Sequence, residues 1–582
     1  MPEAVRDAGA QHSREALTTM PNPDALIATH APLLAQAREA ARTRAFFAAF
    51  AESPSTRIWG EAAPPDGRAA FDALLHETFA IQTPGAHGLI APEVPPYGMP
   101  LDISYPHLHA DGVDELVSAA KKAIPAWRDA GPGLRTAIGI EMLTRINARS
   151  FEFAHAVMHT TGQAFVMAFQ AGGAHAHERG LEAIAYAYDA MMQVPASVSW
   201  EKARGKGEPQ RLAKTYTIVP RGVALVIGCS TFPTWNSYPG LFASLVTGNP
   251  VIVKPHPHAV LPLALTVGVA RDVLTEYGFN PNLITLAVDG AGETLASNLA
   301  MHPEVRVIDY TGSTSYGEWL EANALQARVF TEKAGVNCVV LDSTDDISGL
   351  AANLAYSLSL YSGQMCTTPQ TIFIPRAGID TDNGHATVAD VVSAIGAALD
   401  DLLGDPARAV NMLGAIVNDA VLHRLDDASN AGDVLIKSRT IEHPEFPAAR
   451  VRTPLVVRAA SDATAYSHEC FGPIAFLVET EDTMASLDAW RRIVVASGSL
   501  TASVYSTDAE VLAAAHNVAL DTGVSMSSNL TADTYVNQTV AFSDYHGTGA
   551  NAAANATLTD LAFVAERFRI IETRRPAANP AP

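Results

Sequence analysis

Residues 222–255, GVALVIGCSTFPTWNSYPGLFASLVTGNPVIVKP, contain two short apolar runs on either side of a helix-like segment. GVALVIG and PVIVKP are short and rich in β-branched residues, as buried strands are. The alternation of strand-like and helix-like runs continues through LITLAVDG (283–290) and VRVIDYTG (305–312). Parallel strands joined by helical crossovers form an open sheet, which binds ligands at the carboxyl ends of its strands. The pattern therefore predicts an α/β fold and a crevice after these strands.

A second region of the same kind follows this one along the chain. Its strand-like runs include NCVVLD, QTIFIP, TPLVVRA and AFLVET, and helix-like runs occupy 346–361, 387–403 and 415–429. Before the first region, residues 111–192 have apolar residues at helical spacing, and the polar segment 200–222 is typical of an exposed hairpin. We therefore expect a helical segment, two α/β regions and a hairpin.

The composition excludes several classes of protein. The chain has 582 residues, of which 48% are hydrophobic and 17% charged, so neither a small module nor a disordered chain fits. Its net charge of −22 disfavours nucleic acid and anionic membranes as partners, and no local basic patch is visible. The amino terminus lacks a signal-like apolar run, and the four cysteines are widely separated. We expect a cytoplasmic protein without a membrane span, disulfides or a metal site.

Cys366 and Glu332 are candidates for catalysis, each with a simpler alternative. Cys366 lies in the small, polar loop YSGQMCTTPQ, where an exposed thiol near helix ends can act as a nucleophile. Most lone loop cysteines are not catalytic. Glu332 precedes NCVVLD and is either a partly buried general base or a charge at the end of an element. Cys229 and Cys338 lie in or beside apolar runs and are expected to pack in the core.

Three other positions have both a binding and a structural interpretation. Lys254 ends a strand-like run and either reaches a ribose or phosphate in the crevice or remains solvated. The turn IDYTGSTSYG (308–317) offers free amides and a helix end to a phosphate, but it lacks the glycine spacing of a dinucleotide fingerprint and also fits an ordinary capped turn. Glu469 precedes CFGP, in a structural turn or a ligand clamp.

The order of the motifs is more specific than any one of them. Seven motifs follow one another along the chain: PRGVALVIG with CSTFP, LVTGNPVIVKP, YTGSTSYG, TEKAGVN, SGQMC, ECFGP and AFSDYHGTGAN. In this order they resemble the aldehyde dehydrogenase superfamily over about residues 110–573. From about Met20 to Thr573 the chain resembles more specifically the PaaN-type aldehyde dehydrogenases of phenylacetic acid degradation. Four stretches carry this closer resemblance: HTTGQAFVMAFQAGGAHAHERGLEA, TFPTWNSYPGLFASL, SLSLYSGQMCTTPQ and AFSDYHGTGANAAANA.

The resemblance implies that the chain oxidises an aldehyde with NAD(P). It makes Cys366 the nucleophile that forms a thiohemiacetal and then a thioester, and Glu332 the base that activates water for hydrolysis. It places Lys254 at the adenosine ribose. It places the turn with Gly312, Ser313 and Gly317 at the pyrophosphate, and the pair Glu469 and Phe471 at the nicotinamide ribose.

Two positions depart from the common pattern of the superfamily. Thr231 stands where most members have an asparagine that helps to bind the oxyanion. The Thr231 hydroxyl is therefore the expected donor to the oxyanion. Asn236 would replace it as donor only if the loop folded back. Pro257 stands where many NAD-preferring members have a glutamate that repels a 2′-phosphate. Lys254 or a protonated His256 would then attract that phosphate. We expect NADP as the cofactor, with NAD as the alternative.

The retained Glu332 favours hydrolysis to a free acid over transfer of the acyl group to coenzyme A. The closer resemblance implies as substrate an aliphatic semialdehyde carried on a coenzyme A thioester, formed when an aromatic-derived ring opens. Two alternatives remain, namely a coenzyme A-acylating dehydrogenase and a cofactor-binding scaffold subunit without activity.

The resemblance also implies a domain organisation. A helical extension and a dinucleotide-binding α/β domain occupy 1–196 and 219–333, and a catalytic α/β domain occupies 334–545. An oligomerisation hairpin and the carboxyl-terminal strand and tail occupy 197–218 and 546–582. Because such chains usually pair by adding strands to a neighbour's sheet, we expect a homodimer or a dimer of dimers.

Overall fold

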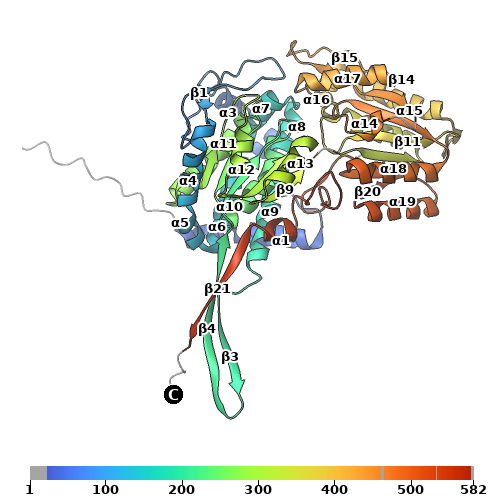
Figure 1. The fold of residues 1–582 in the computed structure, drawn as a ribbon. Coiled ribbons are helices and arrows are strands. Elements are labelled where there is room, and N and C mark those ends of the chain that lie inside the picture. Colours follow the sequence, from blue (N-terminus) through green and yellow to red (C-terminus); the bar gives the residue numbers. More distant parts are fainter. Residues whose placement is uncertain (1–21, 334, 461–463, 532–533, 578–582) are drawn as a thin grey trace, which may run out of the picture.

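The computed structural model describes residues 22–333, 335–460, 464–531 and 534–577. The amino-terminal segment in which we expect no export signal lies outside these described residues. Two α/β bodies lie side by side, and a narrow β arm projects from the first body (Figure 1). The fold class predicted from the alternation of strands and helices is confirmed. No helix in the described ranges combines the length and apolarity that a membrane crossing requires.

The segment before the first sheet is mostly helical, as its periodicity predicts. A short ribbon, β1 (Leu89–Ile90) with β2 (Tyr105–Pro106), interrupts it. Its helices are α1 (Pro23–Thr43), α2 (Thr56–Trp59), α3 (Ala63–Asp72), η1 (Ala110–Gly112), α4 (Val113–Lys122), α5 (Ile124–Asp129), α6 (Gly131–Asn147), α7 (Ser150–Thr161), α8 (Phe165–Phe169), the π-helix η2 (Gln170–His175) and α9 (Ala176–Met191).

The first body contains a five-stranded parallel sheet in the order β7-β6-β5-β8-β9. The strands are β5 (Val223–Ile227), β6 (Val251–Lys254), β7 (Ile284–Leu286), β8 (Val305–Thr311) and β9 (Arg328–Glu332). The helices between them are α10 (Pro233–Val246), α11 (Leu261–Glu276), η3 (Pro281–Leu283), α12 (Leu295–Met301) and α13 (Thr314–Asn323). The strand order reverses between β5 and β8, so their carboxyl ends form the switch point at which such sheets bind ligands.

Both faces of this sheet are buried, which explains the unbroken apolar runs of its strands. Successive residues of β5 point to opposite faces. Ala224 and Val226 enter the core that contains α10 and α11, whereas Val223, Leu225 and Ile227 enter the core that contains α4 and α12.

The second body contains a seven-stranded sheet in the order β14-β17-β18-β11-β10-β19-β20, in which only β14 is antiparallel to its neighbour. The strands are β10 (Asn337–Leu341), β11 (Pro369–Pro375), β14 (Asp433–Ile436), β17 (Leu455–Ala459), β18 (Ile474–Thr480), β19 (Thr501–Tyr505) and β20 (Ser525–Ser528). Two ribbons lie beside it, made of β12 (Ile379–Thr381) with β13 (Gly384–Ala386) and β15 (Thr440–Ile441) with β16 (Val451–Arg452).

Helices cover both faces of the second sheet. They are α14 (Ile347–Ser359), η4 (Leu360–Gly363), α15 (Val388–Leu403), α16 (Pro406–Leu413), α17 (Asp419–Ala431), η5 (Ala465–Ser467), α18 (Thr483–Ser497) and α19 (Ala509–Thr522). The helix expected at 415–429 begins four residues later, because the Asn418 side chain caps it by accepting a hydrogen bond from the Ala420 amide.

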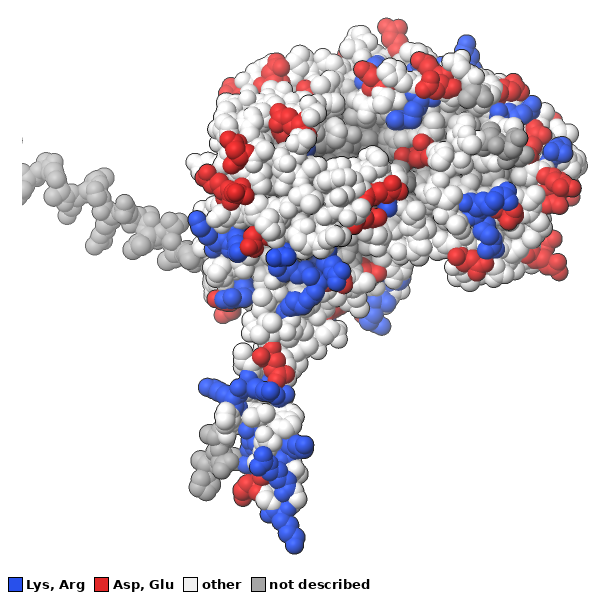
Figure 2. Space-filling view, viewed as in Figure 1, with Lys and Arg blue, Asp and Glu red and all other residues white. Residues whose placement is uncertain are grey.

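The arm is a three-stranded antiparallel sheet in the order β21-β4-β3, made of β3 (Ser197–Arg204), β4 (Gly207–Pro220) and β21 (Phe568–Pro576). The sequence predicts two short strands here, but β4 has 14 residues because it pairs with β3 on one side and with β21 on the other. Figure 2 shows Lys and Arg side chains gathered on the arm. No basic patch is visible in the sequence, because the basic residues of β4 and β21 lie more than 350 positions apart in the chain, as for Lys214 and Arg574.

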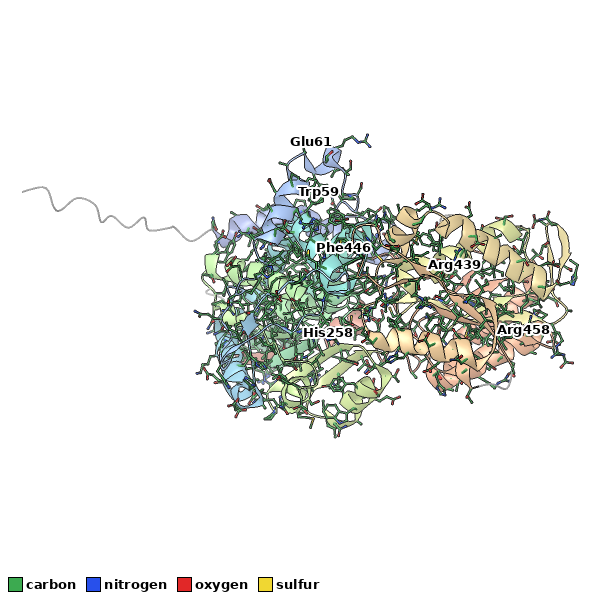
Figure 3. All side chains as sticks on the ribbon, turned by 90° about the horizontal axis from the view of Figure 1, so that it is seen from above. Trp59, Glu61, His258, Arg439, Phe446 and Arg458 are labelled. Carbon is green, nitrogen blue, oxygen red and sulfur yellow. The ribbon has the colours of Figure 1, made fainter. Side chains whose placement is uncertain are left out.

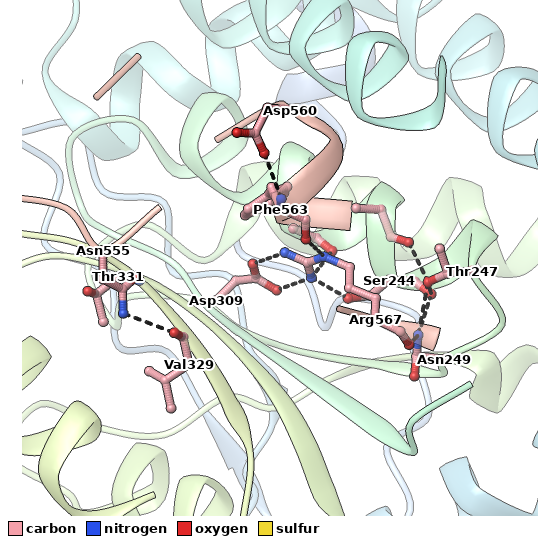
Figure 4. Close-up of polar contacts among 12 residues, drawn as sticks. Ser244, Thr247, Asn249, Asp309, Val329, Thr331, Asn555, Asp560, Phe563 and Arg567 are labelled. Atoms are coloured by element: carbon pink, nitrogen blue, oxygen red, sulfur yellow. Dashed lines mark hydrogen bonds and ion pairs between the residues drawn. The ribbon is translucent and has the colours of Figure 1, made fainter. Parts of the chain in front are cut away.

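Two contacts fasten the arm and the two bodies together. Arg567, at the base of the arm, is fully buried and forms a bidentate ion pair with Asp309 of β8 (Figure 4). Phe446, in the loop before β16, lies at the junction of the two bodies (Figure 3). Its ring centroid is 5.0 Å from that of Tyr97 and 5.6 Å from that of His159. The helical segment and the second body therefore share an aromatic contact.

The carboxyl-terminal helix α20 (Leu561–Ala565) precedes Arg567.

Candidate active site

Cys366 lies in the turn between α14 and β11, on the side of the second body that faces the first sheet. Tyr361 and Ser362 have positive φ angles of 53° and 49°, and Gly363 follows with 63°. A Cβ on Gly363 would lie 2.3 Å from the Gly472 carbonyl oxygen, so only glycine fits this close approach. Asn337 then fixes the Cys366 backbone, since its Nδ2 donates to the Cys366 carbonyl at 2.8 Å.

Glu332, the last residue of β9, lies in the same place and is 3% exposed. One of its oxygens, Oε1, is 3.1 Å from Nε2 of His546. The other, Oε2, accepts a hydrogen bond of 3.2 Å from Nδ2 of Asn236. The same Nε2 of His546 is 3.6 Å from Sγ of Cys366. The structure therefore brings together the two residues that the sequence predicts as nucleophile and base, with His546 between them.

The charges of this group act on one another. The pKa of the Cys366 thiol is held well above its usual value, first by desolvation and then by the negative charge of Glu332. Desolvation also opposes ionisation of Glu332, but the charge and hydrogen bond of a protonated His546, together with hydrogen bonds from Cys366 and Asn236, outweigh it, so the pKa of Glu332 lies below its usual value. Glu332 is therefore an ionised base, whereas Cys366 needs help to become a thiolate.

Sequence reasoning missed His546 and underrated Asn236. His546 belongs to the Gly-rich motif AFSDYHGTGAN, where it is the one ring nitrogen base among small and polar residues. The expected domain boundary at residue 545 separates it from Cys366. The loop that carries it is held against β9, where the Asn555 side chain accepts from the Thr331 amide at 2.8 Å and donates to the Val329 carbonyl at 3.0 Å (Figure 4). Asn236 donates to Glu332 from the first turn of α10, a contact that the sequence did not suggest, and its substitution for the oxyanion donor stays a prediction.

The Thr231 hydroxyl and carbonyl both make hydrogen bonds. Its hydroxyl donates to Sγ of Cys229 at 3.9 Å, and its carbonyl accepts from the Gln163 side chain at 2.8 Å. Cys229 in turn donates to Oδ1 of Asn236 at 3.6 Å. Thr231 therefore supports Asn236 through Cys229, and the prediction that its hydroxyl faces the reacting carbon receives no support from this orientation. Cys229 packs against the main core, as expected, and also takes part in this polar chain.

The predicted adenosine-ribose residues lie at the carboxyl end of β6. Lys254 is buried, and its Nζ is 2.7 Å from Oδ1 of Asp289, which follows β7. Desolvation lowers the pKa of His256 to about 3, assisted by the charges of His258 and Lys254. His256 is therefore neutral at physiological pH. This gives no support to the expectation that a protonated His256 attracts a 2′-phosphate, which stays a prediction.

The predicted pyrophosphate turn leads from β8 into α13. Ser313 precedes the helix and its side chain makes no capping hydrogen bond, so the amides of the first turn remain available to an anion. Gly312 and Gly317 have a packing role as well. A Cβ on Gly312 would lie 2.5 Å from the Tyr310 hydroxyl, and one on Gly317 would lie 2.6 Å from Cγ of Lys333. These residues fit a dinucleotide, which needs such a close approach of backbone to phosphate.

The predicted nicotinamide-ribose pair lies beside Cys366. Glu469, Phe471 and Cys366 line one small cavity. Arg424 fixes the turn by donating to the Phe471 carbonyl at 2.9 Å. Burial raises the pKa of Glu469 to about 7.

Away from this cavity, one group of side chains has the donors of a transition-metal site. The donor atoms of His107, His109 and Glu293 lie within 4.8 Å of one another. The prediction that the chain has no metal site stays a prediction.

Comparison with known proteins finds relatives both by sequence and by structure. The sequence profile described as "Aldehyde dehydrogenase family" matches residues 95–555. A solved structure described as an NAD-dependent aldehyde dehydrogenase from Burkholderia multivorans is 52% identical, with a TM-score of 0.93, over 96% of this chain and 100% of the other.

More distant relatives share the fold. Aldehyde dehydrogenase LUC3 from Fusarium sp is 25% identical over 403 residues, which cover 68% of this chain and 78% of the relative. A 1-pyrroline-5-carboxylate dehydrogenase from Thermus, solved with bound NAD, has a TM-score of 0.72 at 18% identity and covers 92% of this chain and 99% of its own. At that identity the likeness concerns the fold alone.

Proposed function

The chain belongs to the aldehyde dehydrogenase family and is an oxidoreductase that acts on aldehydes, and from this premise we propose that Cys366 is its nucleophile and Glu332 its hydrolytic base. The observation that carries the proposal is the convergence of Cys366 and Glu332 on one imidazole, His546, at 3.6 and 3.1 Å. A thiolate attacks an aldehyde readily and leaves a thioester readily, which divides the oxidation into two easier steps.

Each residue has a separate part in the reaction. Cys366 adds to the carbonyl carbon, and its own backbone amide remains to bind the oxyanion because Thr231 is turned towards Cys229. When bound, nicotinamide dinucleotide supplies the hydride acceptor. Glu332, held ionised by Asn236 and His546, then removes a proton from the water that attacks the thioester.

For the cofactor, we propose that the dinucleotide lies along the carboxyl ends of β6, β5 and β8. The residues that would hold it are Lys254, His256, Gly312, Ser313, Gly317, Glu469 and Phe471. Pro257 presents no carboxylate to a 2′-phosphate, but His256 is neutral and Lys254 already pairs with Asp289. The residues therefore neither exclude nor attract that phosphate. We propose that NAD and NADP both serve, without the NADP preference that the sequence predicts.

For the substrate, we propose an aliphatic semialdehyde carried on a coenzyme A thioester, produced in phenylacetate catabolism. Four unusual stretches of sequence support this assignment through their likeness to the PaaN-type enzymes. The alternative of acyl transfer to coenzyme A is disfavoured by Glu332, because a buried, ionised base fixed by two donors is suited to hydrolysis. The alternative of an inactive scaffold is disfavoured because the nucleophile and the base are in place.

For assembly, we propose that the arm pairs with a second copy of the chain. Both edge strands, β3 and β21, offer unpaired backbone groups on an arm that carries exposed Val198, Ile570 and Ile571. The basic arm also complements a chain of net charge −22.

The test of the proposed function is product analysis with purified protein. We expect the wild type to convert semialdehyde thioesters to free acids, with reduction of NAD or NADP and no consumption of added coenzyme A. Cys366→Ala should lower kcat by at least about a thousandfold, since the covalent path is lost. Cys338→Ala, at a buried cysteine outside the cavity, is the control. Equal efficiency with simple short aldehydes would refute the thioester substrate, and unchanged activity in Cys366→Ala would refute the nucleophile.

A further inference from the structure

The family reaction needs a thiolate at Cys366, and the inference that follows rests on the proposed function of that residue. We propose that His546 is the base that takes the proton from the Cys366 thiol, and that the resulting imidazolium stands between the Cys366 thiolate and the Glu332 carboxylate.

The first step of the argument is geometric. His546 is 4% exposed, and its ring is held edge-on to Trp235 with the centroids 4.7 Å apart. Its Nδ1 is 3.5 Å from the Thr539 hydroxyl oxygen. The opposite nitrogen, Nε2, faces Cys366 Sγ and Glu332 Oε1 together. The ring is therefore oriented so that a single nitrogen serves both the nucleophile and the carboxylate.

The second step is electrostatic. Glu332 is needed as an anion for hydrolysis, but an anion beside Cys366 opposes formation of a thiolate. Glu469 and Cys229 also act against the thiolate when they are charged. Within the described ranges, His546 is the one side chain that can form a cation and contacts Sγ of Cys366. A positive charge on His546 resolves the conflict, because it attracts both anions.

The charges on the elements around His546 are consistent with this role. Glu332 approaches it from β9, and Cys366 from the turn before β11. From α10 it meets only the ring of Trp235. Behind that ring lies the guanidinium of Arg179, which is 5.2 Å from the Trp235 centroid and forms an ion pair of 2.8 Å with Glu182. The Arg179 charge is thus offset by its own partner, Glu182.

The proton balance of the step is simple. Before it, the neutral imidazole carries its proton on Nδ1, next to the Thr539 oxygen, and the lone pair of Nε2 faces the thiol. The S–H bond breaks as an N–H bond forms at Nε2, and no proton or electron leaves the group. The Glu332 carboxylate, with Oε1 3.1 Å from Nε2, favours the imidazolium. It repels a lone pair on Nε2, whereas it accepts a hydrogen bond from a protonated Nε2. Hydrolysis of the thioester later regenerates the thiolate beside the imidazolium.

The experiment measures thiol reactivity without aldehyde or cofactor, so that it does not depend on the complete reaction. The rate of Cys366 alkylation by iodoacetamide is followed from pH 5 to pH 9 in buffer with EDTA, with Cys366→Ser as the blank. In the wild type we expect alkylation to remain fast down to about pH 6. In His546→Gln, which retains a hydrogen-bonding side chain but no titratable nitrogen, the midpoint should rise by more than about one pH unit and the rate at pH 7 should fall at least about tenfold.

A matched control and a rescue separate this role from a structural one. His516→Gln, at an exposed histidine of α19, should leave the profile unchanged. Added imidazole should restore alkylation to His546→Ala, because it fills the vacated place with the same base. If His546→Gln keeps the wild-type profile, the proposal is overturned.

A measurement on the wild type covers the case in which the variants fail to fold. The difference in absorbance at 240 nm between wild type and Cys366→Ser reports the thiolate directly, and we expect it at pH 7. Its absence below pH 8 would overturn the proposal. If instead alkylation of Cys366 leaves aldehyde oxidation intact, the proposed function fails, and the reactivity of the thiol remains a separate result.

Discussion

Arg567 shows how one residue ties a remote segment to the sheet. Its guanidinium donates to both oxygens of Asp309, at 2.7 and 2.6 Å, and to the Ser244 hydroxyl at 2.7 Å (Figure 4). The rings of Phe330 and Phe563 lie 4.5 and 4.1 Å from its central carbon. All the donors that face β8 are thus paired in a site closed to water.

We predict that Arg567→Met destabilises the protein by about 3–5 kcal/mol, because it leaves the Asp309 charge buried without a partner. The double variant Arg567→Met with Asp309→Asn should recover part of that loss, since the charge is then gone. Denaturant unfolding of the single and double variants gives the comparison. A double variant no more stable than Arg567→Met would contradict this account.

Glu469 makes cofactor binding dependent on pH at the residue scale. Burial raises the pKa of Glu469 to about 7, so its carboxyl is mostly protonated at pH 6 and mostly ionised at pH 8. The ionised form accepts hydrogen bonds from ribose hydroxyls more strongly. We therefore predict that the Kd for NAD or NADP, measured by calorimetry, falls by up to about tenfold from pH 6 to pH 8. Glu469→Gln should bind equally at both pH values, and a flat wild-type profile would exclude this role.

At the scale of elements, we propose that the loop between β6 and α11 sets the choice between NAD and NADP. It carries Lys254, His256 and Pro257 to the edge of the crevice, where the charge of Lys254 is offset by Asp289. An added carboxylate would face a 2′-phosphate and repel it.

We predict that kcat/KM for NAD and NADP differs by less than about tenfold in the wild type, which corresponds to about 1.4 kcal/mol. Pro257→Glu should lower kcat/KM for NADP by about tenfold or more while changing that for NAD much less. His258→Gln is the matched control in the same loop. An equal loss with both cofactors would show that the substitution acts on the loop and not on the phosphate.

The element scale also shows where sequence patterns were sufficient. The strands β5, β6 and β8 lie where their apolar runs predict them, because strands buried on both faces cannot tolerate polar residues. The length of β4 was not predictable, because its second half is stabilised by β21, whose residues are remote in sequence.

At the scale of the whole molecule, the arm brings together positive charges that lie far apart in the sequence. Basic residues from β3, β4 and β21 lie together on it, and its Ile570 and Ile571 are exposed. A projecting basic arm on an acidic chain is suited to contact a second copy.

We predict that Ile571→Asp shifts the protein towards the monomer in sedimentation velocity at micromolar concentration, because it places a charge where apolar contact is expected. Val495→Asp, at an exposed apolar residue of α18 outside the arm, should behave as the wild type does. High salt should weaken assembly, since screening reduces the attraction between arm and body. A wild type that is monomeric under these conditions would refute the arm as an interface.

Local patterns were enough for the α/β class and for the first sheet, and they singled out Cys366 and Glu332 as candidates, since apolar periodicity and motif order are properties of short segments. The tertiary structure alone placed His546 against both residues, turned Thr231 away, neutralised His256 and built the basic arm. The physical reason is that these features depend on distance and desolvation between segments separated by many residues. A linear pattern records neither quantity.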